Sequence, residues 1–236
     1  MTGDGSNKEE RTKQSGSRDS TPQSEKKSST PGAPFDVERV ALIDVDMQHD
    51  FVTGSGAHAV REAAEIVEPA KKLIRFAKEH GISTLSTKLV YPKDHAFGKS
   101  QPYCVEGSEG SRKIDECMYP KTRRVIFTAE TKANLFTGDQ IIFERAVDNP
   151  LMAEDFTALL KQIMDRTAIV FGAPLHTTVK QVVIGLRNLQ IPTLVASDVV
   201  APRSGKNVEK AIEEMLEAGA EMITSENLLS GCVQIL

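Results

Sequence analysis

The chain has 236 residues, a formal net charge of -4 at neutral pH and a hydrophobic fraction of 39%. This length and apolar content suffice for one α/β domain with a sizeable core. The slight acidity gives no electrostatic basis for binding nucleic acid or an anionic membrane, and no apolar run approaches membrane-spanning length. The 3 cysteines, an odd number without metal-ligand spacing, argue against a disulfide framework and favour a reducing compartment. With no visible signal peptide, we expect a soluble, cytoplasmic protein.

The first 38 residues differ in composition from the rest of the chain. They consist mainly of Ser, Lys, Glu, Gly, Thr and Pro, and Phe35 is their only large aromatic residue. Such a segment cannot bury enough apolar surface to offset the entropy lost on ordering. We expect a disordered tail over residues 1–38, serving as a solubilising arm or a partner-binding arm, and one folded domain over residues 39–236.

From residue 39 onward, runs typical of strands alternate with amphipathic helical stripes. The strand-like runs cover residues 40–46, 82–88, 124–128, 140–143, 167–172, 191–198 and 221–224. The helical stripes cover residues 60–80, 151–164, 179–190 and 207–218, and a short helix is expected at the end. This alternation predicts right-handed crossovers and a mostly parallel sheet with helices on both faces. The expected fold is therefore a three-layer α/β/α, Rossmann-like domain.

Three local features of this pattern are open. Pro69 lies inside a helical stripe, so it should bend the helix or mark a restart. Residues 124–128 and 140–143 fit either a short hairpin or two successive sheet strands. The segment at 89–122 carries most of the Gly, Pro and Tyr residues, which is typical of a functional lid or insertion.

The run at residues 167–190 organises the candidate site. An apolar strand breaks at Gly172, and the apolar residues from Val179 to Leu189 recur at helical spacing. The turn at 173–178 therefore lies at the carboxyl end of a strand and at the start of a helix. In an open α/β sheet, ligands bind at such strand ends.

Four motifs occur in the order seen in the isochorismatase-like cysteine hydrolases, which include nicotinamidases. They are DMQHDF at 46–51, YCVEGSEG at 103–110, FER at 143–145 before Asn149 and Pro150, and GAPLHTTV at 172–179. The chain resembles this superfamily over residues 39–229. The resemblance implies the same three-layer fold, a small-molecule pocket and assembly into a homo-oligomer.

The resemblance also implies roles for a triad. In that superfamily an Asp at the end of the first strand acts as base, a Lys completes the triad, and a Cys at a helix N-terminus attacks a carbonyl carbon. Asp46 matches the base, with Gln48 beside it; otherwise Asp46 would only cap loop amides. Arg145 stands at the lysine position and Thr178 at the cysteine position. A threonine hydroxyl is far less acidic than a thiol, and an arginine cannot release its proton.

The turn before Thr178 departs from the superfamily as well. Its members commonly have a cis peptide four residues before the nucleophile, where a backbone N–H helps to form the oxyanion hole. Here the peptide joins Ala173 to Pro174, which favours a cis bond but removes the donor. Losing one such donor costs about 3 to 4 kcal/mol in the transition state. His176 follows where the family often has Asp, and it fits a ligand-orienting group, a base for a hydroxyl or a solvated polar residue.

No metal or other cofactor is expected. Nicotinamidase-like members hold a divalent metal through an Asp-x-His pair and a further His, and the matching places carry Leu89, Tyr91 and His95. One imidazole does not make a metal site. His95 is better explained as a loop histidine.

The three cysteines are candidates for a replacement nucleophile. Cys104 lies in a loop motif that often carries a Cys without a nucleophilic role. Cys117 follows on the same loop without an obvious base, and Cys232 is among the last five residues. None of the three is favoured as a nucleophile.

Two hypotheses on function remain. In the first, the chain is a catalytically impaired or inactive relative that keeps the pocket and acts as a binding or assembly subunit. In the second, it hydrolyses a small amide or an isochorismate-like substrate, using Asp46 with Thr178 or a water. The joint loss of the thiol, the lysine and the oxyanion N–H favours the first.

Overall fold

The computed structural model describes residues 36–128, 136–153, 155–202 and 208–233, all within one compact unit. The predicted tail lies outside the described residues except for residues 36–38, which lead into a 3₁₀ turn at Val37–Arg39. No helix in the described ranges is long and apolar enough to cross a bilayer. The tail prediction therefore stays a prediction.

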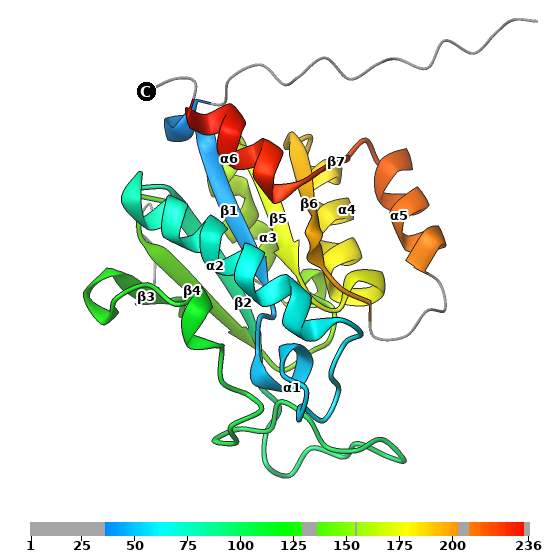
Figure 1. The fold of residues 1–236 in the computed structure, drawn as a ribbon. Helices are drawn as coiled ribbons and strands as arrows, with labels where there is room; N and C mark the ends of the chain where they lie inside the picture. Colours follow the sequence, from blue (N-terminus) through cyan, green and yellow to red (C-terminus); the bar gives the residue numbers. More distant parts are fainter. Residues whose placement is uncertain (1–35, 129–135, 154, 203–207, 234–236) are drawn as a thin grey trace, which may run out of the picture. The chain divides into compact units, whose positions relative to one another are not determined.

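A seven-stranded sheet forms the centre of the domain, as the alternating pattern predicted (Figure 1). Its order is β3-β4-β2-β1-β5-β6-β7, and every pairing is parallel. The strands are β1 Val40–Val45, β2 Ser83–Leu89, β3 Arg124–Ile126, β4 Gln140–Arg145, β5 Thr167–Gly172, β6 Thr193–Val200 and β7 Glu221–Ile223. The parallel pairing of β3 with β4 settles the open alternative in favour of successive sheet strands.

Two helical layers cover the sheet, and alternation along β1 explains why both are needed. Val40 and Leu42 belong to the core under α2 and α6, whereas Ala41 and Ile43 belong to the core under α3, α4 and α5. Successive side chains of a strand point to opposite faces, so a strand buried on both faces needs cover on both. The helices are α1 His49–Val52, α2 Ala63–Glu79, α3 Phe156–Leu160, α4 Lys180–Asn188, α5 Val208–Glu217 and α6 Ser225–Val233.

Several local predictions need correction. α2 runs through Pro69 without a restart. The helix expected over residues 151–164 is reduced to α3, with 3₁₀ turns at Pro150–Met152 and Lys161–Ile163 on either side. The turn before α4 is a π-helix, Leu175–Val179, so the helical stripe starts in wider winding than expected.

The strand order reverses at β1, which lies between β2 and β5. In open α/β sheets this switch point leaves a crevice at the carboxyl ends of the strands. Register brings the last residues of two strand pairs level with each other: Val45 with Gly172, and Leu89 with Arg145. The motifs singled out in the sequence thus converge on one edge of the sheet.

Candidate functional site

A buried ion pair forms the floor of this edge. Arg145 donates from Nη1 to Asp46 Oδ1 at 2.7 Å and from Nη2 to Asp46 Oδ2 at 2.6 Å. The two side chains are 1% and 0% exposed. Thr87 adds a third donor, because its hydroxyl donates to Asp46 Oδ1 at 2.6 Å. The carboxylate at the expected base position is therefore fully engaged.

The backbone at Asp46 is shaped for this contact. Its φ is 48°, a left-handed conformation that residues other than glycine seldom adopt. Its N–H donates to the Thr87 hydroxyl at 3.2 Å, so Thr87 binds both the backbone and the carboxylate. Across the strand, a Cβ on Gly172 would lie 2.0 Å from the carbonyl oxygen of Val45. Only glycine allows the close approach of β5 to β1 at this point.

A second buried ion pair involves Asp44 on β1, two residues before Asp46. Lys113 donates from Nζ to Asp44 Oδ1 at 3.0 Å and to the Thr87 carbonyl oxygen at 3.2 Å. Ser86 donates to Asp44 Oδ2 at 2.9 Å. Burial raises the pKa of Asp44, and the Lys113 ammonium partly offsets that effect. This pair ties the long loop that carries Lys113 to the centre of the sheet.

Gln48 is a clamp for the same loop and does not line the pocket. Its Nε2 donates to the carbonyl oxygens of Leu89 at 2.8 Å and Ser111 at 2.9 Å, and its Oε1 accepts from the Leu89 N–H at 2.8 Å. The side chain is fully buried. The motif at 46–51 suggested Gln48 as a pocket residue, but its amide binds the backbone and leaves nothing to offer a ligand.

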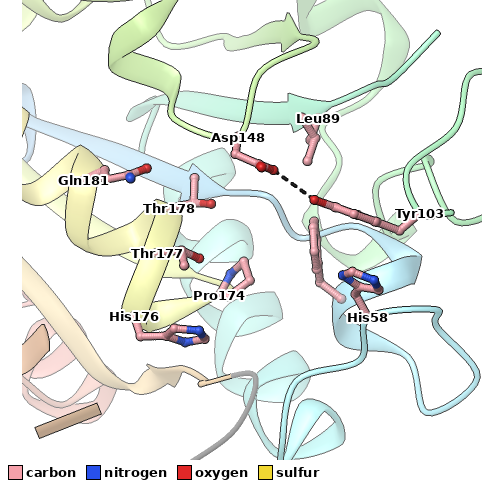
Figure 2. Close-up of a pocket in the computed structure, with 10 residues that line it drawn as sticks. His58, Leu89, Tyr103, Asp148, Pro174, His176, Thr177, Thr178 and Gln181 are labelled. Carbon is pink, nitrogen blue, oxygen red and sulfur yellow. Dashed lines mark hydrogen bonds between the residues drawn. The ribbon is translucent and has the colours of Figure 1, made fainter. Parts of the chain in front are cut away.

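A cavity of about 170 Å³ opens at this edge of the sheet. It is lined by residues from α1 and the segment after it, the end of β2, the long loop, the segment after β4 and the turn before α4 (Figure 2). The lining residues are Phe51, His58, Leu89, Tyr103, Asp148, Pro174, His176, Thr177, Thr178 and Gln181. Asp46 and Arg145 are not among the lining residues.

Aromatic rings form one wall of the cavity, with Tyr103 from the long loop and with Phe51 and His58 from α1 and the segment that follows it. His58 stacks on Tyr103 with ring centroids 3.8 Å apart, and Phe51 meets Tyr103 edge-on at 6.0 Å. Tyr91 and Tyr103 donate their hydroxyls to Asp148 Oδ1 at 2.7 and 3.0 Å. Burial raises the pKa of both tyrosines, which keeps the two hydroxyls protonated.

The turn at 173–178 forms the opposite wall. The Ala173–Pro174 peptide is cis, as the sequence led us to expect. Ala173 is fully buried and its N–H donates to the Val45 carbonyl oxygen at 3.0 Å, while Pro174 has no N–H to offer. Thr178 lines the cavity and is 5% exposed, and His176, also in the lining, is half-buried. Among the described residues, no hydrogen bond joins the Thr178 hydroxyl to Asp46.

No curated protein sequence matches this chain. The family model of the isochorismatase domain matches residues 40–227, which is most of the chain. The chain belongs to the isochorismatase family.

Solved structures share the fold of this isochorismatase-family chain. A pyrazinamidase of Pyrococcus horikoshii in complex with zinc has a TM-score of 0.65 at 22% identity, covering 79% of this chain and 99% of that one. PnC1 from L. infantum in complex with nicotinate has a TM-score of 0.63 at 16% identity, covering 83% of this chain and 97% of that one. The MAR1 ribonuclease from Caenorhabditis elegans has a TM-score of 0.60 at 21% identity, covering 86% of this chain and 85% of that one. At these identities the likeness establishes the common fold.

The positions that family resemblance equates with metal ligands do not fit a metal ion in this chain. Leu89 offers only hydrocarbon, and the Tyr91 hydroxyl is engaged by Asp148. The His95 ring stacks on Tyr91 with centroids 4.2 Å apart. No group of three His, Cys, Asp or Glu side chains with metal-binding geometry occurs among the described residues. We therefore derive no chemistry through a metal.

The environments of Cys104 and Cys117 do not suit a nucleophile. Cys104 is fully buried, and its Sγ accepts from Gln48 Nε2 at 3.5 Å. Burial, together with the carboxylates of Asp46 and Asp50, raises the pKa of the Cys104 thiol well above its usual range. Burial likewise raises the pKa of the buried Cys117 thiol. Reactive cysteines need the opposite environment, exposed and electropositive.

Sequence reasoning missed four residues that shape this isochorismatase-family site. Asp148, Tyr103 and His58 line the cavity, and Lys113 holds the loop. Asp148 and Tyr103 are 45 residues apart in sequence, and although Tyr103 begins the matched motif at 103–110, that motif gave it no role. One signal was present for Asp148, because it lies between the matched residues Arg145 and Asn149.

Proposed function

We propose that this protein is an impaired member of the isochorismatase family, one that keeps a small-molecule pocket and uses it for binding without efficient hydrolysis. The observation that carries the proposal is the bidentate pair between Arg145 and Asp46. A general base must take a proton on the same oxygens that the guanidinium and the Thr87 hydroxyl now occupy.

The energetic consequence follows from burial. Removing the charge from one partner of a buried ion pair costs about 3 to 5 kcal/mol, because the other charge is left uncompensated. Each 1.4 kcal/mol corresponds to roughly a tenfold change in rate. A cost of this size corresponds to about two to three and a half powers of ten, which is as large as the whole benefit of a typical general base, so the pair with Arg145 opposes the use of Asp46 as a base.

The turn supplies independent support. Thr178 at the cysteine position has a hydroxyl with no dedicated base among the described residues, and a threonine needs such a base to attack a carbonyl carbon. Pro174 lacks the N–H that would stabilise an oxyanion. The buried thiols of Cys104 and Cys117 carry raised pKa values, so neither replaces the missing nucleophile.

The test is a paired binding and turnover experiment on the full chain. Nicotinamide, an N-carbamoyl amine and isochorismate are incubated with wild type, Asp46→Asn, Thr178→Ala and the control Glu144→Gln, whose side chain pairs with Lys88 outside the cavity. We expect saturable binding of at least one compound and no turnover above the uncatalysed rate. Turnover that both Asp46→Asn and Thr178→Ala abolish, while Glu144→Gln retains it, would establish the alternative of an active hydrolase.

A further inference from the structure

We propose that the pocket selects a small, flat organic cation, held by the carboxylate of Asp148 and the aromatic wall formed by Phe51, His58 and Tyr103. This inference rests on the proposed binding function and names the chemical class of its ligand.

Arg145 has neutralised one carboxylate and positioned another. Its Nη1 and Nη2 engage Asp46, and Nη2 also donates to the backbone carbonyl oxygen of Asp148 at 3.3 Å. The guanidinium fork thus folds the segment after β4 back over the floor, which a lysine ammonium could not do with the same geometry. The negative charge that faces a ligand is therefore at Asp148, in the cavity wall, and no longer at Asp46.

The carboxylate of Asp148 keeps acceptor capacity for a ligand. Both tyrosine hydroxyls, from Tyr91 and Tyr103, donate to Oδ1. Oδ2 accepts no hydrogen bond within the described ranges, and Asp148 lines the cavity. Figure 2 shows the Asp148 side chain directed toward Tyr103 at the edge of the pocket. Two neutral donors orient the carboxylate without cancelling its charge.

The remaining walls suit a flat cation. Phe51, His58 and Tyr103 supply ring surfaces, and Leu89 and Pro174 supply apolar contact. Aromatic faces attract cations, and the attraction increases where water is excluded. The ten lining residues include no lysine or arginine. An anionic ligand would therefore meet a carboxylate with no cation in the cavity wall to balance it.

The cavity also limits the size of the ligand. A volume of about 170 Å³ holds roughly six water molecules at liquid density, which corresponds to one substituted six-membered ring. Thr177, Thr178 and Gln181 lie on the wall opposite Tyr103 and can hydrogen-bond a polar substituent (Figure 2). A ring with a positive charge at one end and an amide at the other matches both walls.

The experiment uses three probes of nearly equal shape and different charge: 1-methylnicotinamide as cation, 3-methylbenzamide as neutral isostere and 3-methylbenzoate as anion. Affinity for the full chain is measured by calorimetry or ligand-observed NMR. We expect the cation to bind about tenfold more tightly than the neutral amide, and the anion to bind most weakly. Asp148→Asn should remove the preference for the cation and change the affinity of the neutral amide by less than about twofold.

Glu144→Gln is the matched control, because it also removes one acidic charge from the same segment of chain but outside the cavity. It should leave the ranking unchanged. Equal affinities for cation and neutral amide, or an equal effect of both variants, would overturn the charge assignment while leaving a binding pocket in place. Failure of all three probes to bind would count against both proposals. Release of carboxylic acid from the amides in the same samples would overturn only the impaired function.

Discussion

Replacing Arg145 with methionine should destabilise the fold more than any ordinary surface change, because it strands a buried charge. Asp46 is 0% exposed and receives three side-chain hydrogen bonds, two of them from Arg145. Loss of one partner of such a pair costs about 3 to 5 kcal/mol, and the complete burial places this site in the upper part of that range. For a domain of this size, a loss of about 4 to 5 kcal/mol corresponds to a drop in melting temperature of about 8 to 20 °C.

Urea-induced unfolding of the full chain, followed by circular dichroism, measures the free energy of unfolding. Lys88→Met is the matched control, since Lys88 on β2 and Glu144, the β4 residue next to Arg145, form a 2.9 Å pair in which the side chains are 22% and 42% exposed. That variant should lose less than about 1 kcal/mol. The double variant Asp46→Asn with Arg145→Met should recover a large part of the loss. If Arg145→Met and Lys88→Met cost the same, the argument from the buried pair is wrong.

Three further predictions follow from the site and its loop. Gly110→Ala should destabilise the domain by about 1 to 3 kcal/mol, because its Cβ would lie 2.0 Å from Asp50 Oδ2, whereas Gly54→Ala, with nothing within 4 Å, should be near neutral in the same unfolding assay. Thr178→Cys combined with Pro174→Ala should react with iodoacetamide at neutral pH faster than Cys104, whose pKa burial raises; equal peptide labelling in mass spectrometry would contradict our placement of the site. Burial raises the pKa of the tyrosines, and it raises that of Tyr119 to about 12. Because the folded pKa exceeds the unfolded value near 10, the free energy of unfolding should fall as pH rises from about 10 to 12. Tyrosinate absorbance that reaches half its maximum at about pH 10 in the native state would refute this.

The fold could be predicted from sequence because its causes are local. Strand and helix periodicities alternate along the chain, and β1 is apolar at every position from Val40 to Ile43, which requires a sheet covered on both faces. The motifs at the strand ends then converge automatically, because parallel strands end at one edge. The assignment of Asp46, Arg145 and Thr178 to one catalytic site rests on the family resemblance and stays a prediction.

The composition of the pocket wall could not be predicted in the same way. Tyr103 and Asp148 meet only because the long loop is held by Gln48 and Lys113, through contacts that span 41 to 69 residues. Such contacts depend on tertiary packing and leave no periodic trace in sequence. The contact of Arg145 with the Asp148 backbone depends on the same tertiary packing.

Thr87 connects the two buried ion pairs at β1, Asp46 with Arg145 and Asp44 with Lys113. Its hydroxyl reaches Asp46 and its carbonyl oxygen accepts from Lys113, so one residue borders both pairs. Residues that share a partner in this way show coupling energies of about 0.5 to 3 kcal/mol in thermodynamic cycles. A substitution at Arg145 should therefore also weaken the contacts of Lys113, and with them the attachment of the loop that carries Tyr103. We therefore expect the Asp46–Arg145 pair and the loop that shapes the cavity to be stabilised or destabilised together.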